Sequence, residues 1–161
     1  MTRSGGSPRA LLLATVLVPL AAVAAALVSQ HVYDMQPCPW CVLQRVVFVA
    51  IALAALPGLL VNQRGMRRIS AAVVLTLSLC GAAAALWQHF VAASSVSCNM
   101  TLADRIVGGL GLDELAPQVF AAYATCADAA VKIAGISYEF FSLTLFIALG
   151  LAAIAVWRRP G

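Results

Sequence analysis

Four long apolar runs constrain the fold of this chain more than any other feature of its sequence. They cover about residues 10–28, 42–61, 70–90 and 138–157. Each is close to the roughly 20 residues that a helix needs to cross about 30 Å of hydrocarbon. Helices satisfy their own backbone hydrogen bonds inside a bilayer, so we expect an all-α membrane protein, a four-transmembrane-helix bundle. The 161 residues then form a single integral membrane domain (1–161), because too little chain remains for a separate soluble one.

The first apolar run also has some features of a cleaved signal peptide. Arg3 and Arg9 precede it, and the small residues at 22–26 resemble a cleavage site. The run is longer than the roughly 7 to 15 residues of a signal-peptide core, so we favour a membrane helix. Under both interpretations, the segment that follows the run lies on the far side of the membrane.

Charged residues are distributed unequally over the connections between the runs. The basic residues before the first run, between the second and third, and after the fourth are Arg3, Arg9, Arg64, Arg67, Arg68, Arg158 and Arg159. By the positive-inside rule, both termini are cytoplasmic, whereas the connection at 29–41 and the one long loop at 91–137 are periplasmic. The net charge of +4 does not indicate nucleic-acid binding, because the basic residues lie at the ends of apolar runs without interleaved aromatic side chains.

Four of the five cysteines fall in the two outer connections. Cys38 and Cys41 form a Cys-x-x-Cys pair just before the second run, and Cys98 and Cys126 lie in the long loop. Disulfides persist on this side of a membrane. Four cysteines allow three connectivities, of which proximity favours Cys38–Cys41 and leaves Cys98–Cys126. Cys80 lies in the middle of the third run, where we expect it to pack as a small buried hydrophobe.

The cysteine pairs also have structural interpretations. Most disulfides outside the cytoplasm only brace loops, but a bridge between Cys38 and Cys41 adds little stability, because loop-closure entropy grows with loop length. We therefore favour a redox couple at this pair, while the long-loop bridge alone would make an adequate staple. Zinc is disfavoured because the long-loop pair lacks Cys-x-x-Cys spacing, and c-type haem because no His follows Cys41.

Three residues at the outer ends of the second and third runs suggest how electrons leave the pair. Cys41 begins a helix, so the backbone N–H groups and the helix dipole favour its thiolate. Arg45 follows one turn later on the same face, where it either stabilises negative charge or extends toward the headgroups. His89 either donates a hydrogen bond or proton at this depth or anchors its helix at the interface.

Electrons taken from another protein need an acceptor. The chain contains no Gly-rich fingerprint of a flavin or nicotinamide site, and it has no room for that fold. A carrier dissolved in the bilayer, a quinone, is available at the depth of these residues. Arg45 can hydrogen bond to a quinone oxygen while Cys41 faces the ring.

The combination of motifs resembles the disulfide bond formation protein B (DsbB) family of bacterial inner membranes. The matching features are the four runs, the Cys-x-x-Cys pair with Arg45 four residues on, two loop cysteines, and Pro-Gln-Val-Phe at 117–120. The resemblance implies that Arg45 and His89 belong to a quinone site, with ubiquinone ahead of menaquinone. Family members also carry an acidic residue in the first span, whereas the region around Val23 is apolar here.

The resemblance also implies an order of thiol exchange. A reduced periplasmic DsbA-like protein attacks Cys98, Cys126 then attacks Cys38, and Cys41 is released as a thiolate toward the quinone. We therefore expect a thiol:quinone oxidoreductase that reoxidises its partner and supports disulfide formation. The alternatives are a membrane scaffold whose disulfides only brace its loops, and a related oxidase dedicated to one substrate protein.

Overall fold

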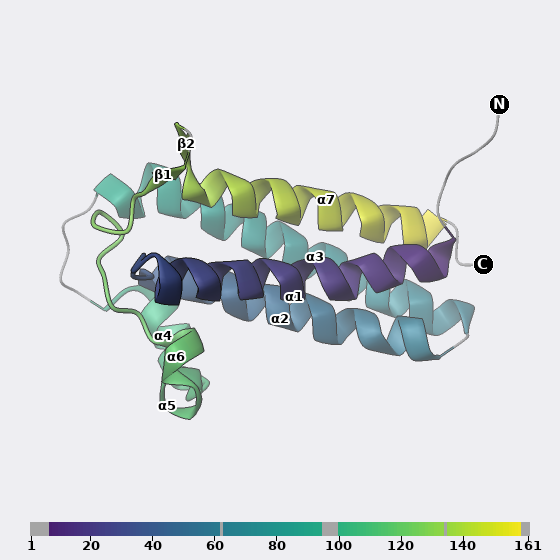
Figure 1. The fold of residues 1–161 in the computed structure, drawn as a ribbon. Helices are drawn as coiled ribbons and strands as arrows, with labels where there is room; N and C mark the ends of the chain where they lie inside the picture. Colours follow the sequence, from purple (N-terminus) through teal and green to yellow (C-terminus); the bar gives the residue numbers. More distant parts are fainter. Residues whose placement is uncertain (1–6, 62, 95–99, 134, 159–161) are drawn as a thin grey trace.

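Four long helices lie side by side and form the body of the molecule (Figure 1). In this computed structural model, which describes residues 7–61, 63–94, 100–133 and 135–158, the four helices are α1 (Pro8–Val32), α2 (Pro39–Leu60), α3 (Arg64–Phe90) and α7 (Tyr138–Arg158). All four are long and apolar enough to cross a membrane. The expected four-helix membrane bundle is therefore confirmed.

The long loop contains short elements that lie at one end of the bundle (Figure 1). They are η1 (Ala92–Ser94), α4 (Leu102–Gly109), α5 (Leu112–Leu115), α6 (Pro117–Phe120), and the antiparallel strands β1 (Lys132–Ile133) and β2 (Ile136–Ser137). Helix α4 begins with a capping box, in which Thr101 and Asp104 satisfy each other's backbone N–H groups. Both α4 and α6 contact α2, so the loop folds back over the start of that helix.

The start of α2 is determined by three consecutive residues. Cys38 is the N-cap, and its sulfur accepts a hydrogen bond from the Cys41 backbone N–H over 3.3 Å. Pro39 occupies the first turn, where its missing N–H costs nothing and its fixed φ suits a helix. Just before the cap, the carbonyl of Pro37 accepts backbone hydrogen bonds from Tyr123 and Ala124. The long loop is therefore tied to the chain immediately in front of the cysteine pair.

The centre of the bundle is packed around two stacked aromatic rings. Phe48 of α2 and Phe146 of α7 lie with ring centroids 4.2 Å apart and planes 8° from parallel. Gly81 of α3 leaves the space for Phe146, because a Cβ on Gly81 would lie 2.4 Å from the nearest ring carbon. This packing holds three helices together below the cysteine pair.

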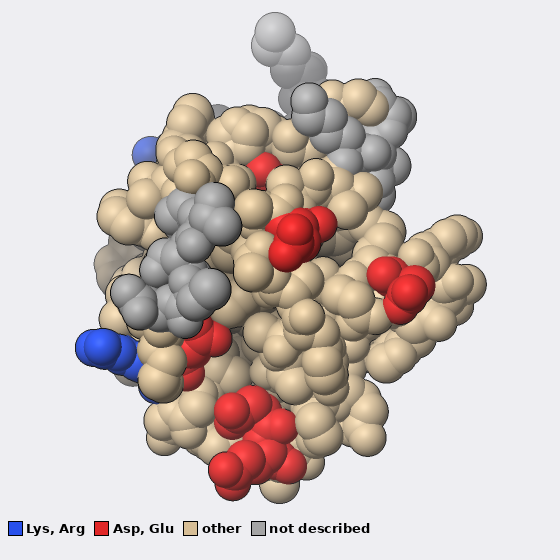
Figure 2. Space-filling model, turned by 90° about the vertical axis from the view of Figure 1, so that its left-hand side faces the viewer, with Lys and Arg blue, Asp and Glu red and all other residues tan. Residues whose placement is uncertain are grey.

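Most arginines lie at the end of the bundle opposite the loop carboxyl groups, although Arg45 and Arg105 lie toward the loop end. Figure 2 shows the loop end, over which acidic side chains are scattered. The described acidic residues of the loops are Asp34, Asp104, Asp113, Glu114 and Asp128. The other end, where α1 and α3 begin and α7 ends, carries Arg9, Arg64, Arg67, Arg68 and Arg158.

Candidate functional site

Three sulfur atoms meet at the start of α2. The Cys38 and Cys41 sulfurs lie 2.7 Å apart, and Cys126 from the long loop packs with Cys38 in one buried cluster. Cys38 is completely buried, with an exposed fraction of 0%. It therefore lies between two possible exchange partners and is shielded from solvent by both.

The pKa values of the Cys38 and Cys126 thiols are shifted in opposite directions. The pKa of Cys38 is raised, because hydrogen bonding with Cys126 and with Cys41 favours its protonated form and because it is buried. The pKa of Cys126 is lowered, chiefly because its sulfur accepts the hydrogen bond from Cys38; burial opposes this effect, and the Trp40 backbone N–H adds to it. In the reduced protein, Cys126 is thus the more acidic of these two thiols.

Of the two remaining cysteines, the structure describes Cys80 but not Cys98. Cys98 lies outside the described residues, so its pairing with Cys126 stays a prediction. Cys80 was expected to be buried, and this was wrong: it is exposed on the outside of α3. The periodicity of that helix turns the Cys80 position toward lipid, whereas nearby Ser78 and Gly81 face its neighbours.

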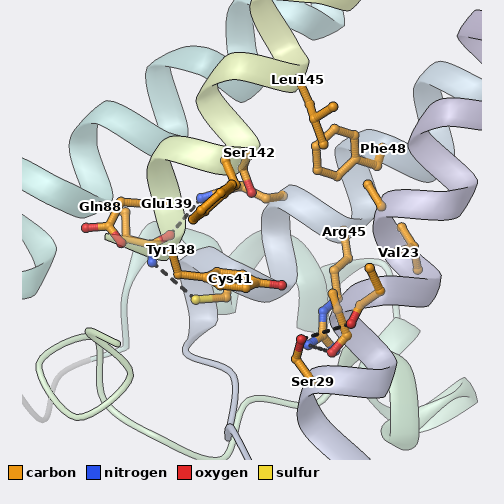
Figure 3. Close-up of a pocket in the computed structure, with 15 residues that line it drawn as sticks. Val23, Ser29, Cys41, Arg45, Phe48, Gln88, Tyr138, Glu139, Ser142 and Leu145 are labelled. Carbon is orange, nitrogen blue, oxygen red and sulfur yellow. Dashed lines mark hydrogen bonds between the residues drawn. The ribbon is translucent and has the colours of Figure 1, made fainter. Parts of the chain in front are cut away.

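A cavity of about 310 Å³ opens between α1, α2, α3 and α7 on the other side of Cys41 (Figure 3). Most of its surface is apolar, with contributions from Val23, Phe48 and Leu145. Both Cys41 and Arg45 line it, so the structure brings these two predicted residues to one space. The cavity has the size and lining of a small-molecule site, for which about 300 to 1,000 Å³ is usual.

Arg45 is held inside the protein by three acceptors. Its guanidinium donates to the Gln30 side-chain oxygen over 2.7 Å, to the Val119 carbonyl over 2.9 Å and to the Ala26 carbonyl over 3.5 Å. The residue is 6% exposed. These contacts join α1, α2 and the long loop, and they favour a role inside the site over extension toward the headgroups.

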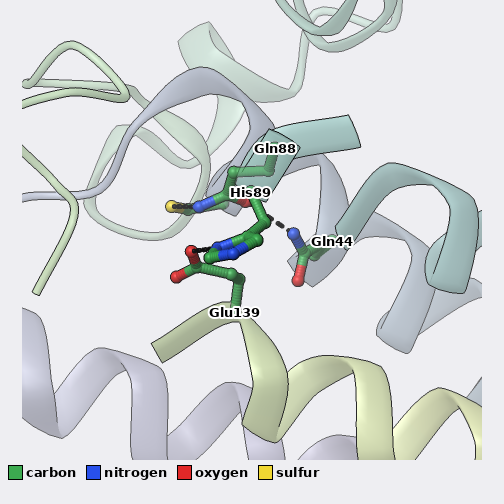
Figure 4. A network of polar contacts seen from close by, with 5 residues as sticks. Gln44, Gln88, His89 and Glu139 are labelled. Atoms are coloured by element: carbon green, nitrogen blue, oxygen red, sulfur yellow. Dashed lines mark hydrogen bonds and ion pairs between the residues drawn. The ribbon is translucent and has the colours of Figure 1, made fainter. Parts of the chain in front are cut away.

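Two glutamines that were not predicted from the sequence complete the surroundings of Cys41. Gln88 donates from its side-chain nitrogen to the Cys41 sulfur over 3.2 Å. Gln44 donates in turn to the Gln88 side-chain oxygen over 2.7 Å (Figure 4). Because the amide oxygen of Gln88 is engaged by Gln44, its N–H is directed at the sulfur. The available signal was their polarity within apolar helices, where such residues are usually functional or paired.

His89 lies beside the cavity without lining it. Its Nδ1 is 2.7 Å from Oε1 of Glu139, the second residue of α7 (Figure 4). Its ring also packs against those of Phe140 and Phe90, with centroids 4.6 and 4.9 Å away. Glu139 itself lines the cavity, and it was not predicted as a site residue because its sequence position marks it only as one of the outer acidic residues. Val23, where the first span lacks the family's acidic residue, lines the same cavity.

These features define a class of protein: a multi-pass helical membrane protein with exchangeable thiols next to a cavity between its helices. Among the residues that the structure describes, no group of three or more His, Cys, Asp or Glu side chains could hold a metal ion.

Comparison with known proteins identifies the family within that class. The family described as "Disulfide bond formation protein DsbB" matches residues 8–156. A protein of Herminiimonas arsenicoxydans named "Disulfide bond formation protein B" is 35% identical over 144 residues, which cover 89% of this chain and 90% of the relative. "Disulfide bond formation protein B 1" of Pseudomonas aeruginosa is 32% identical over 159 residues, covering 95% and 97%. The chain belongs to the DsbB family and is a disulfide bond formation oxidoreductase.

Proposed function

We propose that this protein takes electrons from a reduced periplasmic DsbA-like thiol oxidase and passes them to a quinone in the membrane. The observation that carries the proposal is the position of Cys41. Its sulfur contacts Cys38 and at the same time lines the apolar cavity with Arg45. One residue thus links a chain of exchangeable thiols to a space accessible to a lipid-soluble acceptor.

The packing of Cys126 beside Cys38 supports the following exchange steps. Attack by the partner's thiolate at Cys98 forms a mixed disulfide with Cys98, breaks the Cys98–Cys126 disulfide and frees the Cys126 thiolate; the partner's second thiol later displaces Cys98 and completes the partner's disulfide. Cys126 then attacks Cys38, so that a Cys38–Cys126 bond forms, the Cys38–Cys41 bond breaks and Cys41 leaves as a thiolate. The packing of Cys126 beside Cys38 supports this step, because the attacking sulfur already lies next to its target. Gln88 donates to the sulfur that leaves, which stabilises its charge.

The residues around the cavity suit a quinone. Their surface is mostly apolar, and Arg45 supplies a cationic donor at the edge of the space. When bound, a quinone supplies an acceptor for two electrons and two protons. Ubiquinone is the first candidate and menaquinone the second. In net terms, one partner dithiol becomes a disulfide and one quinone becomes a quinol.

The proposed location is the bacterial inner membrane, with both termini in the cytoplasm. The separation of charges supports this orientation, because the end of the bundle rich in arginine is the end expected inside. The sulfur cluster and the acidic loop end then face the periplasm (Figure 2), where a soluble partner is present and disulfides persist.

The test is a purified-protein assay that follows quinone absorbance with a reduced DsbA-like protein as the electron donor. We expect wild-type protein to consume quinone in proportion to the donor oxidised. Cys41→Ser should lower the rate by at least about a hundredfold, because a hydroxyl cannot take part in thiol–disulfide exchange.

Cys80→Ser is the matched control, since Cys80 is an exposed cysteine outside the sulfur cluster. This variant should retain the wild-type rate. Full quinone reduction by Cys41→Ser would refute the role of Cys41. A wild-type protein whose disulfides resist the donor would instead favour a membrane scaffold.

A further inference from the structure

The cavity next to Cys41 contains one carboxyl group among its described lining residues, that of Glu139. This residue is only 5% exposed, although an isolated carboxylate is costly to bury. Within the described part of the chain, its side chain has one hydrogen-bond partner, His89 Nδ1 at 2.7 Å. Helix α7 therefore begins with a buried acidic residue that lines the cavity and that hydrogen bonds with His89.

His89 connects this buried acid to the outside of the bundle. The His89 side chain is 30% exposed and that of Glu139 is 6% exposed. His89 is the second-last residue of α3 and Glu139 the second residue of α7, so both lie where the helices leave the membrane. The two residues form a continuous path of titratable groups from the outer face to the cavity (Figure 4).

We propose that Glu139 delivers a proton to the acceptor in the cavity and that His89 reloads Glu139 from the outer face. This inference rests on the proposed quinone reduction. Oxidation of the partner's dithiol, carried through Cys38 and Cys41, breaks two S–H bonds, forms one S–S bond, and releases two electrons and two protons. The electrons pass to the quinone, and each of its two oxygens gains a proton.

One of those two protons comes from the carboxyl of Glu139. The carboxylate that remains regains a proton from His89 Nδ1, and His89 takes one from water. That proton replaces one released by the thiols, so the exchange balances over a cycle. Several other polar groups of the cavity are less suited to proton delivery: the amides of Gln44 and Gln88 and the hydroxyls of Ser29 and Ser142 do not titrate, and the guanidinium of Arg45 donates hydrogen bonds without releasing its proton.

The charged and titratable groups around Glu139 come from three helices. His89 approaches from α3, Cys41 and Arg45 line the same cavity from α2, and Tyr138 precedes Glu139 on α7. Tyr138 is the one other residue among them with an O–H group. A variant of Tyr138 therefore has to be compared with a variant of Glu139.

Glu139→Gln is the decisive substitution, because it keeps the size and hydrogen bonding of the side chain but removes the proton. In the full-length protein with a reduced DsbA-like donor and ubiquinone, we expect quinone reduction to fall about a hundredfold at low pH, the lower range for a lost general acid. The ratio of wild-type to variant rate should approach one as pH rises, because the wild-type pair then loses its own proton. The apparent KM for quinone should be unchanged.

Three comparisons make the result specific. Glu114→Gln on α5, an exposed acid outside the cavity, and Tyr138→Phe should both keep the wild-type pH profile. His89→Gln should slow the same step as Glu139→Gln. Single-turnover exchange between the donor and the cysteines should be normal in Glu139→Gln, which establishes that the variant is folded.

A second readout does not depend on turnover. Infrared spectra of the protein without quinone should contain a carbonyl band of a protonated carboxyl that disappears as pH rises and is missing in Glu139→Gln. Equal rates for wild type and Glu139→Gln at every pH, or a loss that is constant with pH, would overturn the inference while leaving the proposed function intact. If wild-type protein reduces no quinone, the proposed function fails and this inference fails with it.

Discussion

Cys38 lies between the two cysteines with which it can exchange disulfide bonds, Cys41 and Cys126. Its sulfur contacts Cys41 on the membrane side and Cys126 on the loop side. In the reduced cluster Cys126 is the more acidic of the two thiols, because its pKa is lowered and that of Cys38 is raised.

This difference in acidity leads to a prediction about alkylation. In the fully reduced protein, iodoacetamide should modify Cys126 before Cys38, and the pH midpoint for Cys126 should fall below the roughly 8.5 of a free cysteine. The sign follows from the lowered pKa of Cys126, since its thiolate persists to lower pH than that of an ordinary thiol. Mass spectrometry of peptides after timed alkylation measures both midpoints.

Cys38→Ala supplies the control for that measurement. It removes the S–H donor that is the main cause of the lowered pKa of Cys126, so the Cys126 midpoint should move upward. An unchanged midpoint in this variant would mean that the hydrogen bond from Cys38 does not determine the acidity of Cys126.

Residue types alone predicted part of the site. Cys41 and Arg45 could be placed together because they lie one turn apart on one helix. Gln88 and Glu139 could not be placed in the site from the sequence. The contact of Gln88 with Cys41 depends on how α3 is rotated against α2, and the contact of Glu139 with His89 depends on how α7 is rotated against α3. No local pattern in an apolar helix specifies that rotation; it follows from packing of the whole bundle.

At the scale of elements, the packing of α3 against α7 keeps the cavity in shape. Both helices contribute cavity residues near their outer ends, Gln88 and Glu139. Farther into the membrane, Gly81 of α3 allows Phe146 of α7 to approach and to stack on Phe48. Small residues commonly permit such close approach between membrane helices.

Gly81→Ala should therefore destabilise the protein. The added Cβ would meet ring atoms of the fully buried Phe146, and overpacking of this kind costs about 1–3 kcal/mol. Thermal or denaturant unfolding in detergent, followed by circular dichroism, measures the change.

Gly65→Ala is the matched control, because a Cβ at Gly65 meets nothing within 4 Å. It should be neutral or stabilise slightly, as expected for Ala in place of Gly in a helix. If both variants unfolded alike, the close approach at Gly81 would not contribute to stability.

The elements themselves were partly readable from the sequence. The apolar runs predicted four membrane helices, but the helices α4, α5 and α6 of the long loop were not predicted. A local signal for α4 was present, since Thr101 followed three residues later by Asp104 is a capping-box pattern. The bonds from Tyr123 and Ala124 to Pro37, which bring the loop to the cysteine pair, are backbone contacts between distant segments and have no such signal.

For the whole molecule, the charge separation predicts one orientation in the membrane. In intact cells, a membrane-impermeant maleimide should label Glu114→Cys, in the long loop, and should not label Gln63→Cys, between α2 and α3. After the cells are permeabilised, both should react, because both positions are exposed. Labelling of Gln63→Cys in intact cells would reverse the orientation and place the sulfur cluster in the reducing cytoplasm.

The complete burial of Cys38 also bears on selectivity. Glutathione and other small thiols in the surroundings cannot reach this sulfur without displacing Cys41 or Cys126. In the reaction that we propose, oxidising equivalents from the bilayer therefore leave only through the loop cysteines and do not reach bystander thiols. Insulation of this kind lets a strongly oxidising membrane reaction coexist with proteins that still carry free cysteines on their way to folding.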